Sequence, residues 1–189
     1  MSSLVCLLEE PSAREMLEGV LPRILPENIS VHYIIFEGKQ DLEKQVERKL
    51  RLWQKPDSLF LVMRDQDAGD CVVIKDNLIR KINRSGKSDT AMVRIACREL
   101  ESFYLGDLQA VEYGIKVNGL ADKQNSRKYR EPDSLVNAAQ ELVRLSGKQY
   151  QKVAGSRAIG PCLRVGGENK SHSFNVLVNG IKKLVGSNS

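Results

Sequence analysis

Short apolar runs alternate with longer amphipathic segments through the first hundred residues, and this alternation constrains the fold most. The runs Ser3–Leu8, Ser30–Phe36, Ser58–Arg64 and Thr90–Arg98 have the length and composition of buried strands. Helical segments lie between them, so each connection is expected to be a right-handed crossover between parallel strands. The sequence therefore predicts an α/β fold with a mostly parallel sheet of about four strands flanked by helices.

The segments between the strands carry apolar residues at helical spacing. Residues 11–25 begin with Pro11, which suits the first turn of a helix. Residues 41–53 place one apolar stripe at Leu42, Val46, Leu50 and Trp53. Residues 71–82 are expected to turn one side to the core, at Val73, Leu78 and Ile82.

The charge distribution divides the chain into two parts. Residues 1–114 hold 16 Lys and Arg against 19 Asp and Glu, whereas residues 115–189 hold 13 against 5. We expect an α/β core over residues 1–107 and a basic, mainly helical C-terminal lobe over residues 108–189 that packs on it. A basic surface suits a polyanionic partner, although a solvated basic face has the same composition.

Composition also bears on the environment of the protein. No run approaches the roughly 18 consecutive apolar residues of a membrane-spanning helix, and residues 1–10 lack the basic start of a signal peptide, so we expect a cytoplasmic protein without membrane contact. The four cysteines form no C-x-x-C pair, which favours buried reduced thiols over a zinc or redox motif: Cys6, Cys71, Cys97 and Cys162.

Acidic residues follow every expected strand: Glu9 and Glu10, Glu37, Asp65 and Asp67, Glu99 and Glu101. The carboxyl ends of parallel strands meet at one edge of a sheet, so these side chains are expected to converge there. Repulsion between carboxylates disfavours such a cluster unless a hard cation compensates for it. An oxygen-only ligand set selects magnesium, manganese or calcium over zinc.

Within this set several alternatives stay open. Asp65 and Asp67 would project to the same side of an extended segment, as two ligands of one ion or of two. Asp70 suits a helix cap instead of a metal ligand. Glu101 has the character of a solvated helix residue as much as of a ligand, and Glu10 suits the first turn of the helix that it opens.

The segments "LLEEPSAREML" and "LVMRDQDAGD" resemble the Toprim fold of topoisomerases, primases and OLD-type nucleases, in which one strand ends in Glu and a later strand in Asp-x-Asp. With "FEGKQDL" and "IACRELESFYLGD", the chain is similar to a small bacterial Toprim-like family of unknown function. Members of that family are often encoded beside an AAA or ABC-type ATPase in loci suspected of antiviral defence against phage. The resemblance covers roughly residues 4–107.

The resemblance implies a magnesium- or manganese-dependent nuclease. Glu9 matches the Toprim glutamate, and Asp65 and Asp67 match the metal-binding pair, so these three are the implied catalytic residues. Glu10 stands where Toprim proteins usually have glycine, which leaves open whether Glu9 or Glu10 faces the metal. The full expected ligand set is Glu9, Glu10, Asp65, Asp67 and Glu99.

Basic residues supply the expected contacts to a DNA or RNA substrate. Lys39 follows Gly38 after the second strand, and Lys152 and Arg157 lie in the basic region. Tyr129 and Tyr150 in that region suit occasional stacking on bases. The oligomeric state stays open.

Three functions compete at this stage. The first is a nuclease, the effector of an ATPase-gated defence system. The second is a non-catalytic Toprim-like module that binds and regulates a partner ATPase. The third is a phosphatase with Asp65 as nucleophile, which ranks last because such enzymes carry the aspartate pair after the first strand and Gly69 replaces the usual Thr or Val.

Overall fold

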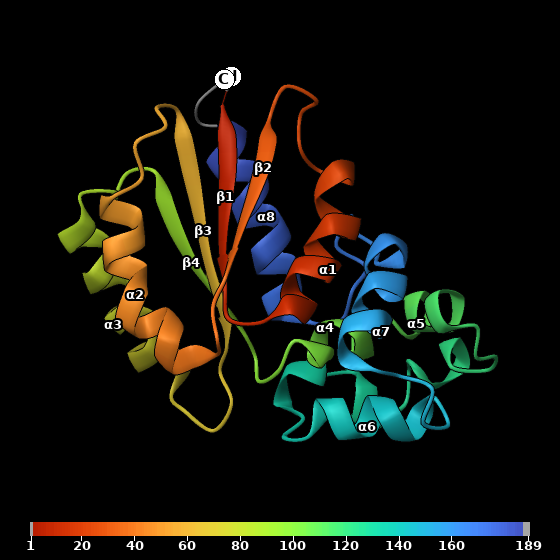
Figure 1. Ribbon diagram of the computed structural model, residues 1–189. Helices are drawn as coiled ribbons and strands as arrows, with labels where there is room; N and C mark the ends of the chain where they lie inside the picture. Colours follow the sequence, from red (N-terminus) through yellow and green to blue (C-terminus); the bar gives the residue numbers. More distant parts are fainter. Residues whose placement is uncertain (1, 187–189) are drawn as a thin grey trace.

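Four parallel strands form the centre of the molecule (Figure 1). The structure, a computed structural model, describes residues 2–186. The strands lie in the order β2-β1-β3-β4 and each neighbouring pair is parallel. Their bounds are Ser3–Leu8 (β1), Ser30–Ile35 (β2), Ser58–Asp65 (β3) and Ala91–Ala96 (β4). The predicted α/β class with a parallel sheet is confirmed.

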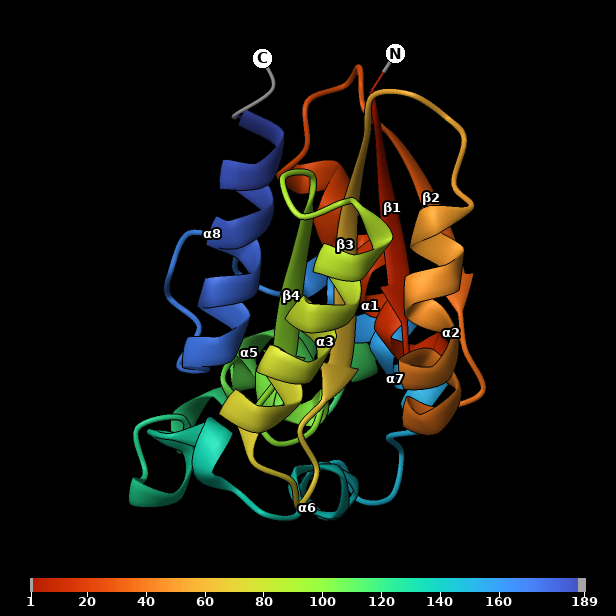
Figure 2. The ribbon, with the colours of Figure 1, turned by 90° about the vertical axis from the view of Figure 1, so that its left-hand side faces the viewer.

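Helices cover both faces of this sheet (Figures 1 and 2). Helices α2 (Lys39–Arg51) and α3 (Cys71–Ser85) pack on one face. Helix α1 (Pro11–Val20), continued by the 3-10 turn η1 (Leu21–Arg23), and α8 (His172–Gly186) cover the other. Strand side chains alternate between the two faces, so along β3 the α2/α3 face receives Phe60 and Val62 and the α1/α8 face receives Leu59, Leu61 and Met63.

The remaining elements gather at the carboxyl end of the sheet, where Figure 1 places α4 to α7. These are α4 (Glu101–Leu105), α5 (Leu108–Ile115), α6 (Ala138–Leu145), α7 (Lys152–Ile159) and the 3-10 turns η2 (Ala121–Lys123), η3 (Arg127–Tyr129), η4 (Pro132–Ser134) and η5 (Gly160–Cys162). We call residues 101–163 the lobe. Its buried side chains join the hydrophobic cluster of the α1/α8 face, so lobe and sheet share one core.

Several helices differ from the sequence prediction in detail. Val73 was expected on the buried stripe of α3, but its side chain is 55% exposed, and Leu78 and Ile82 face the core. Val73 precedes Leu78 by five residues, which is about 140° around an α-helix, so the buried stripe instead begins at Ile74, which packs against the same cluster. Asp70 caps α3, accepting hydrogen bonds from the N–H groups of Val72 (2.8 Å) and Val73 (3.0 Å). The helical segment over residues 11–25 is an α-helix only to Val20, and a 3-10 turn that contains Pro22 follows it.

The order of the strands fixes where a ligand site can form. The chain leaves β1 toward β2 on one side, and β3 pairs with β1 on the other, so the connections diverge between β1 and β3. In open α/β sheets, ligands bind outside the carboxyl ends of the strands at such a switch point. Among residues 2–186, no helix has the length and apolar content needed to cross a bilayer.

Candidate functional site

The end of β1 and the end of β3 are joined by a carboxylate. The Oε2 atom of Glu9 accepts a hydrogen bond from the backbone N–H of Asp65 at 3.0 Å, and the N–H of Glu9 donates to the carbonyl of Met63 at 3.3 Å. Glu9 directly follows β1, and Asp65 is the last residue of β3, so the sheet positions both residues. The structure thus brings two of the three predicted catalytic residues together at the switch point.

One set of charges lies on the α2 side of Glu9. Arg64, only 5% exposed, forms an ion pair with Glu43 of α2 and lies 3.7 Å from Asp67. The Nζ atom of Lys39, the first residue of α2, lies 2.7 Å from the Oδ2 atom of Asp67. We call Lys39, Glu43, Arg64 and Asp67 the α2-side group. Its position follows from strand alternation, because Arg64 continues the row of β3 side chains that face α2 and α3.

A second set lies on the lobe side. The Nζ atom of Lys152, at the start of α7, lies 2.9 Å and 3.1 Å from the two carboxylate oxygens of Glu10. Glu101 is fully buried and its Oε1 atom accepts a hydrogen bond from the hydroxyl of Tyr150 at 2.9 Å. Its Oε2 atom is buried without a hydrogen-bond partner within the described residues. We call Glu10, Asp65, Glu101 and Lys152 the lobe-side group.

The lobe-side group holds crowded negative charge. Burial raises the pKa of Asp65 well above its usual range, and the charges of Glu10, Glu101 and Glu9 raise it further. Burial also raises the pKa of Glu9 and of Glu101. Burial opposes the charge of Lys152, but its hydrogen bond to Glu10 and the nearby carboxylates outweigh that effect and raise its pKa. Lys152 is therefore the cation that compensates this group.

Asp65 and Asp67 do not share the side that strand alternation predicted. Asp65 is the last residue of β3, and Asp67 has a φ of 55°, so the extended backbone ends between them. Asp67 consequently contacts Arg64 and Lys39, whereas the carboxylates that raise the pKa of Asp65 include those of the lobe side. Glu9 lies between the two groups, since its pKa responds to charges from both.

The donor chemistry of the site suits a hard divalent cation. Carboxylates come from three separate segments, and the unpartnered oxygen of Glu101 and the raised pKa of Asp65 are features that such a cation would compensate. As the side chains stand, however, no three His, Cys, Asp or Glu residues among residues 2–186 are grouped closely enough to hold a metal ion. Lys39, Arg64 and Lys152 supply the compensating charge.

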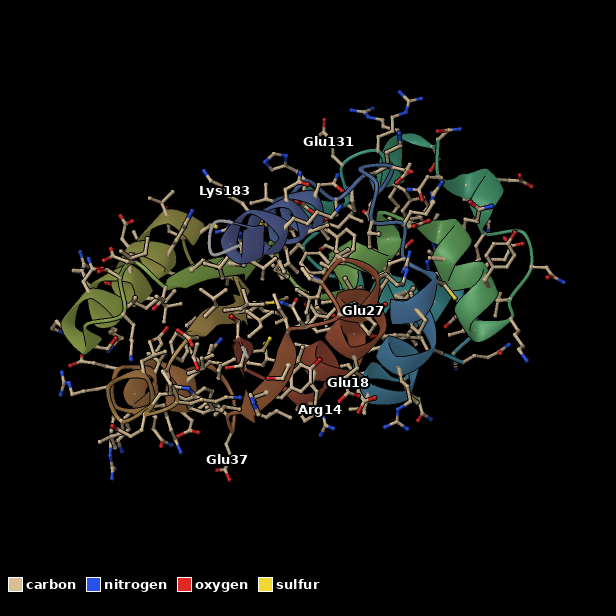
Figure 3. All side chains as sticks on the ribbon, turned by 90° about the horizontal axis from the view of Figure 1, so that it is seen from above. Arg14, Glu18, Glu27, Glu37, Glu131 and Lys183 are labelled. Atoms are coloured by element: carbon tan, nitrogen blue, oxygen red, sulfur yellow. The ribbon has the colours of Figure 1, made fainter. Side chains whose placement is uncertain are left out.

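Apart from Glu9, which lies between the groups, two predicted site residues lie outside both of them. The carboxylate of Glu99 accepts a hydrogen bond from the backbone N–H of Ala139 at 2.7 Å, at the start of α6. Arg157 forms an ion pair with Glu15 of α1, with Nε and Oε2 2.6 Å apart. The roles expected of Glu99 and Arg157 therefore stay predictions. Glu37, the acid expected to follow β2, extends away from the body of the molecule (Figure 3), and this segment contributes Lys39 instead.

The sequence left the role of Glu101 open, and the structure places it beside Asp65. The apolar residues that follow Glu101 in the sequence indicate that it begins a buried helix. Glu101 is the first residue of the segment "ESFYL" of α4, and all five of these residues are buried. An acid at the start of a buried helix must face other polar groups within the protein. Here those groups are Tyr150 and Lys152.

The basic region is less open to a substrate than its composition predicted. Lys128 and Arg144 pair with Glu141, and Arg164 pairs with the fully buried Asp107 at 2.7 Å. Stacking of bases on Tyr129 and Tyr150 was a wrong expectation because each tyrosine is only 4% exposed. Their hydroxyl groups bind Glu141 and Glu101, respectively.

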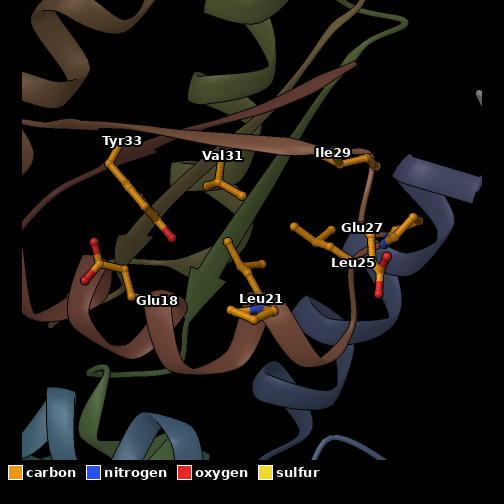
Figure 4. Close-up of a pocket in the computed structure, with 9 residues that line it drawn as sticks. Glu18, Leu21, Leu25, Glu27, Ile29, Val31 and Tyr33 are labelled. Carbon is orange, nitrogen blue, oxygen red and sulfur yellow. The ribbon is translucent and has the colours of Figure 1, made fainter. Parts of the chain in front are cut away.

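An apolar pocket lies apart from these charges. It has a volume of about 450 Å³ and is lined by side chains that include Leu21, Leu25, Val31 and Tyr33 (Figure 4). Val31 stands near the amino end of β2, whereas the acidic groups follow the carboxyl ends of β1 and β3. The pocket therefore takes no part in the candidate site.

Fold and site together define a doubly wound α/β protein in which acidic side chains at the switch point are paired with lysines from α2 and α7. The chain belongs to the DUF4276 family, a domain of unknown function, which matches residues 8–182. No curated protein and no solved structure matches the chain. Membership of a family of unknown function agrees with the expectation of an uncharacterised family.

Proposed function

We propose that the chain is a magnesium- or manganese-dependent, Toprim-type nuclease that cleaves phosphodiester bonds in DNA or RNA, as the effector of an ATPase-gated phage-defence system. The observation that carries the proposal is the convergence of Glu9 on Asp65 at the switch point. The Glu9 carboxylate binds the backbone N–H of Asp65 there, further acids lie on either side, and a lysine faces each group.

The proposal assigns a role to each side chain. Glu9, Asp65 and Asp67 would hold the cation, and Glu10 and Glu101 would complete its surroundings. A bound divalent cation polarises the scissile phosphate and neutralises charge that develops on the leaving oxygen. Because its pKa is raised, Glu9 is suited to accept and return a proton.

The lysines would act on the substrate. Lys39 and Lys152 reach the site from α2 and from α7, and an ammonium group that releases its carboxylate can bind a phosphate oxygen as a point charge. This places one cation on each side of Glu9, so a nucleic-acid backbone would cross the carboxyl end of the sheet between Lys39 and Lys152.

The test is cleavage of plasmid DNA and of structured RNA by the purified chain with Mg²⁺, Mn²⁺ or EDTA. Cleavage is expected with either metal and is expected to be lost in Asp65→Asn and Asp67→Asn. Asp70→Asn is the matched control, because Asp70 lies in the same loop, is committed to capping α3, and Asn caps a helix equally well. Cleavage that persists in Asp65→Asn would overturn the mechanism.

A second function is favoured by a different observation. Each acidic group already contacts a cationic side chain, and no ready-made metal cluster exists among the described residues. This is the arrangement expected of a non-catalytic Toprim-like module that binds and regulates a partner ATPase. Co-purification with an ATPase encoded beside it, unchanged by EDTA and by Asp65→Asn, would support this function over the nuclease.

A further inference from the structure

Two thiols from separate elements face each other beside the candidate site. Cys71 is the first residue of α3 and Cys97 is the first residue after β4. Their sulfur atoms lie 3.8 Å apart although the residues are 26 positions apart in the chain. The spacing of the cysteines in the sequence gave no indication of this pair, which forms because α3 returns the chain to the strand next to β3.

A small reagent can reach both sulfur atoms. Cys71 and Cys97 are each half-buried and both line a pocket of about 140 Å³, together with Lys75 and His172. A water molecule occupies about 30 Å³ in the liquid, so this pocket admits a molecule the size of a peroxide. Cys6, by contrast, is fully buried in the sheet.

We infer that Cys71 and Cys97 form a reversible intramolecular disulfide when the protein meets a peroxide. In the first step one sulfur attacks the O–O bond, becomes a sulfenic acid, and the peroxide oxygen that leaves is released as water or alcohol. In the second step the other sulfur attacks the sulfenic sulfur and a water molecule leaves. The two thiols lose two protons and two electrons, and the peroxide is reduced by those two electrons.

Either sulfur can make the first attack, because both thiols line the pocket that would admit the peroxide. The neighbouring thiol then resolves the sulfenic acid. The bond requires the sulfur atoms to approach from 3.8 Å to about 2.05 Å.

The disulfide would tie together the two segments that are hydrogen-bonded to each other at Asp67. The N–H of Gln66 donates to the carbonyl of Ala96 at 3.0 Å, and the N–H of Asp67 donates to the carbonyl of Arg98 at 2.8 Å. Oxidation therefore fixes the two segments that position Asp67. An effect on metal binding or cleavage rests on the proposed function, whereas formation of the disulfide does not.

The experiment treats the native full chain with hydrogen peroxide and counts the free thiols. The expected result is a fall from four thiols to two in the wild type and from three to one in Cys162→Ser, reversed by dithiothreitol. Tryptic digestion without reduction is expected to join the peptides of residues 65–75 and 95–98. Four remaining thiols, or bridges that include Cys6 or Cys162, would overturn the proposal.

Matched variants separate the disulfide from its consequence. Cys71→Ser and Cys97→Ser are expected to form no intramolecular bridge, and the urea midpoint of the wild type is expected to rise on oxidation while theirs does not. Mn²⁺ binding is then compared between oxidised and reduced wild type, with peroxide-treated Cys97→Ser as control. If the oxidised protein forms the disulfide but binds Mn²⁺ as tightly as the reduced protein, the proposed effect on the site is overturned and the disulfide itself is not.

Discussion

The carboxylate of Glu9 is bound to the backbone N–H of Asp65 across 3.0 Å, and this contact couples the ends of the two central strands. Glu9 also lies 3.9 Å from the guanidinium of Arg64, and the charge of Glu10 raises its pKa from the other side. Glu9, which belongs to neither group, is thus linked to both. Its substitution should separate structural from chemical contributions.

Replacing Glu9 tests its hydrogen bond. Glu9→Ala leaves the half-buried N–H of Asp65 without its acceptor and is expected to lower the free energy of unfolding by about 1–2 kcal/mol. Glu9→Gln keeps an acceptor oxygen and is expected to cost less than about 1 kcal/mol, while it removes the charge required for Mn²⁺ binding. Urea denaturation and Mn²⁺ titration of both variants measure the two effects. Equal destabilisation by the two substitutions would contradict the role of the hydrogen bond.

Asp65 is expected to make stability fall as pH rises. Burial raises its pKa in the folded protein, so its contribution is present below the unfolded value of 3.8 and is lost as pH rises through the folded pKa. Asp65→Asn should therefore be more stable than the wild type at neutral pH and equally stable near pH 3. Unfolding curves of both proteins across this range measure the difference. A neutral-pH loss of stability in Asp65→Asn would show that its charge is well compensated.

The sequence predicted that acids at the ends of the first and third strands lie close together. This part of the site depends only on the apolar strand pattern and on parallel pairing of the strands. Four apolar runs became four parallel strands, and acids after the first and third runs met because β1 and β3 are neighbours. The backbone at Asp67 was not predictable, because its positive φ is set by hydrogen bonds to the segment after β4.

Contacts made by the lobe were also beyond sequence reasoning. Lys152 reaches Glu10 across 142 positions, and Tyr150 reaches Glu101 across 49. Such contacts depend on how α4 and α7 pack against the sheet and against each other. The apolar periodicity of a single segment does not determine this packing. For the same reason Glu99, which is close to the strand end in sequence, binds α6 instead of the acidic groups.

Glu141 should give the lobe the opposite pH dependence. Its hydrogen bond from Arg144 lowers its pKa to about 2, although burial opposes the shift. Its contribution is present above the unfolded value of 4.5 and is lost as pH falls toward about 2. Because Arg144 is 64% and Lys128 47% exposed, solvent screening limits the expected cost of Glu141→Gln to about 1–2 kcal/mol at neutral pH.

The measurement for Glu141→Gln is its unfolding free energy relative to wild type between about pH 2 and pH 7. The difference should vanish at the acidic end, where the wild-type carboxyl is itself protonated. A cost that does not change with pH would instead indicate loss of packing around Tyr129, whose hydroxyl contacts Glu141.

Lys152 is expected to compete with a bound cation. It contacts Glu10, and the charges of Glu101 and Asp65 contribute to its raised pKa, so Lys152→Met leaves three carboxylates without their compensating charge. A gain of about 1 kcal/mol in Mn²⁺ binding, or roughly fivefold in affinity, is expected for removal of one nearby positive charge at an effective dielectric constant of a protein surface. Cleavage should fall in the same variant, because the proposed contact to the substrate phosphate is removed with the charge.

Lys49→Met, at an exposed position of α2, is the control for loss of one unit of charge from the whole protein. Both variants are titrated with Mn²⁺ at low and at moderate salt. Salt screens the distant Lys49 more strongly than Lys152, so the comparison separates the effect of a charge beside the site from the effect of the net charge of the protein. Tighter binding with slower cleavage in Lys152→Met alone is the expected outcome. Weaker Mn²⁺ binding in Lys152→Met would mean that the lysine holds the carboxylates in place for the metal, and would reverse the assignment of Lys152 from competitor to positioning residue.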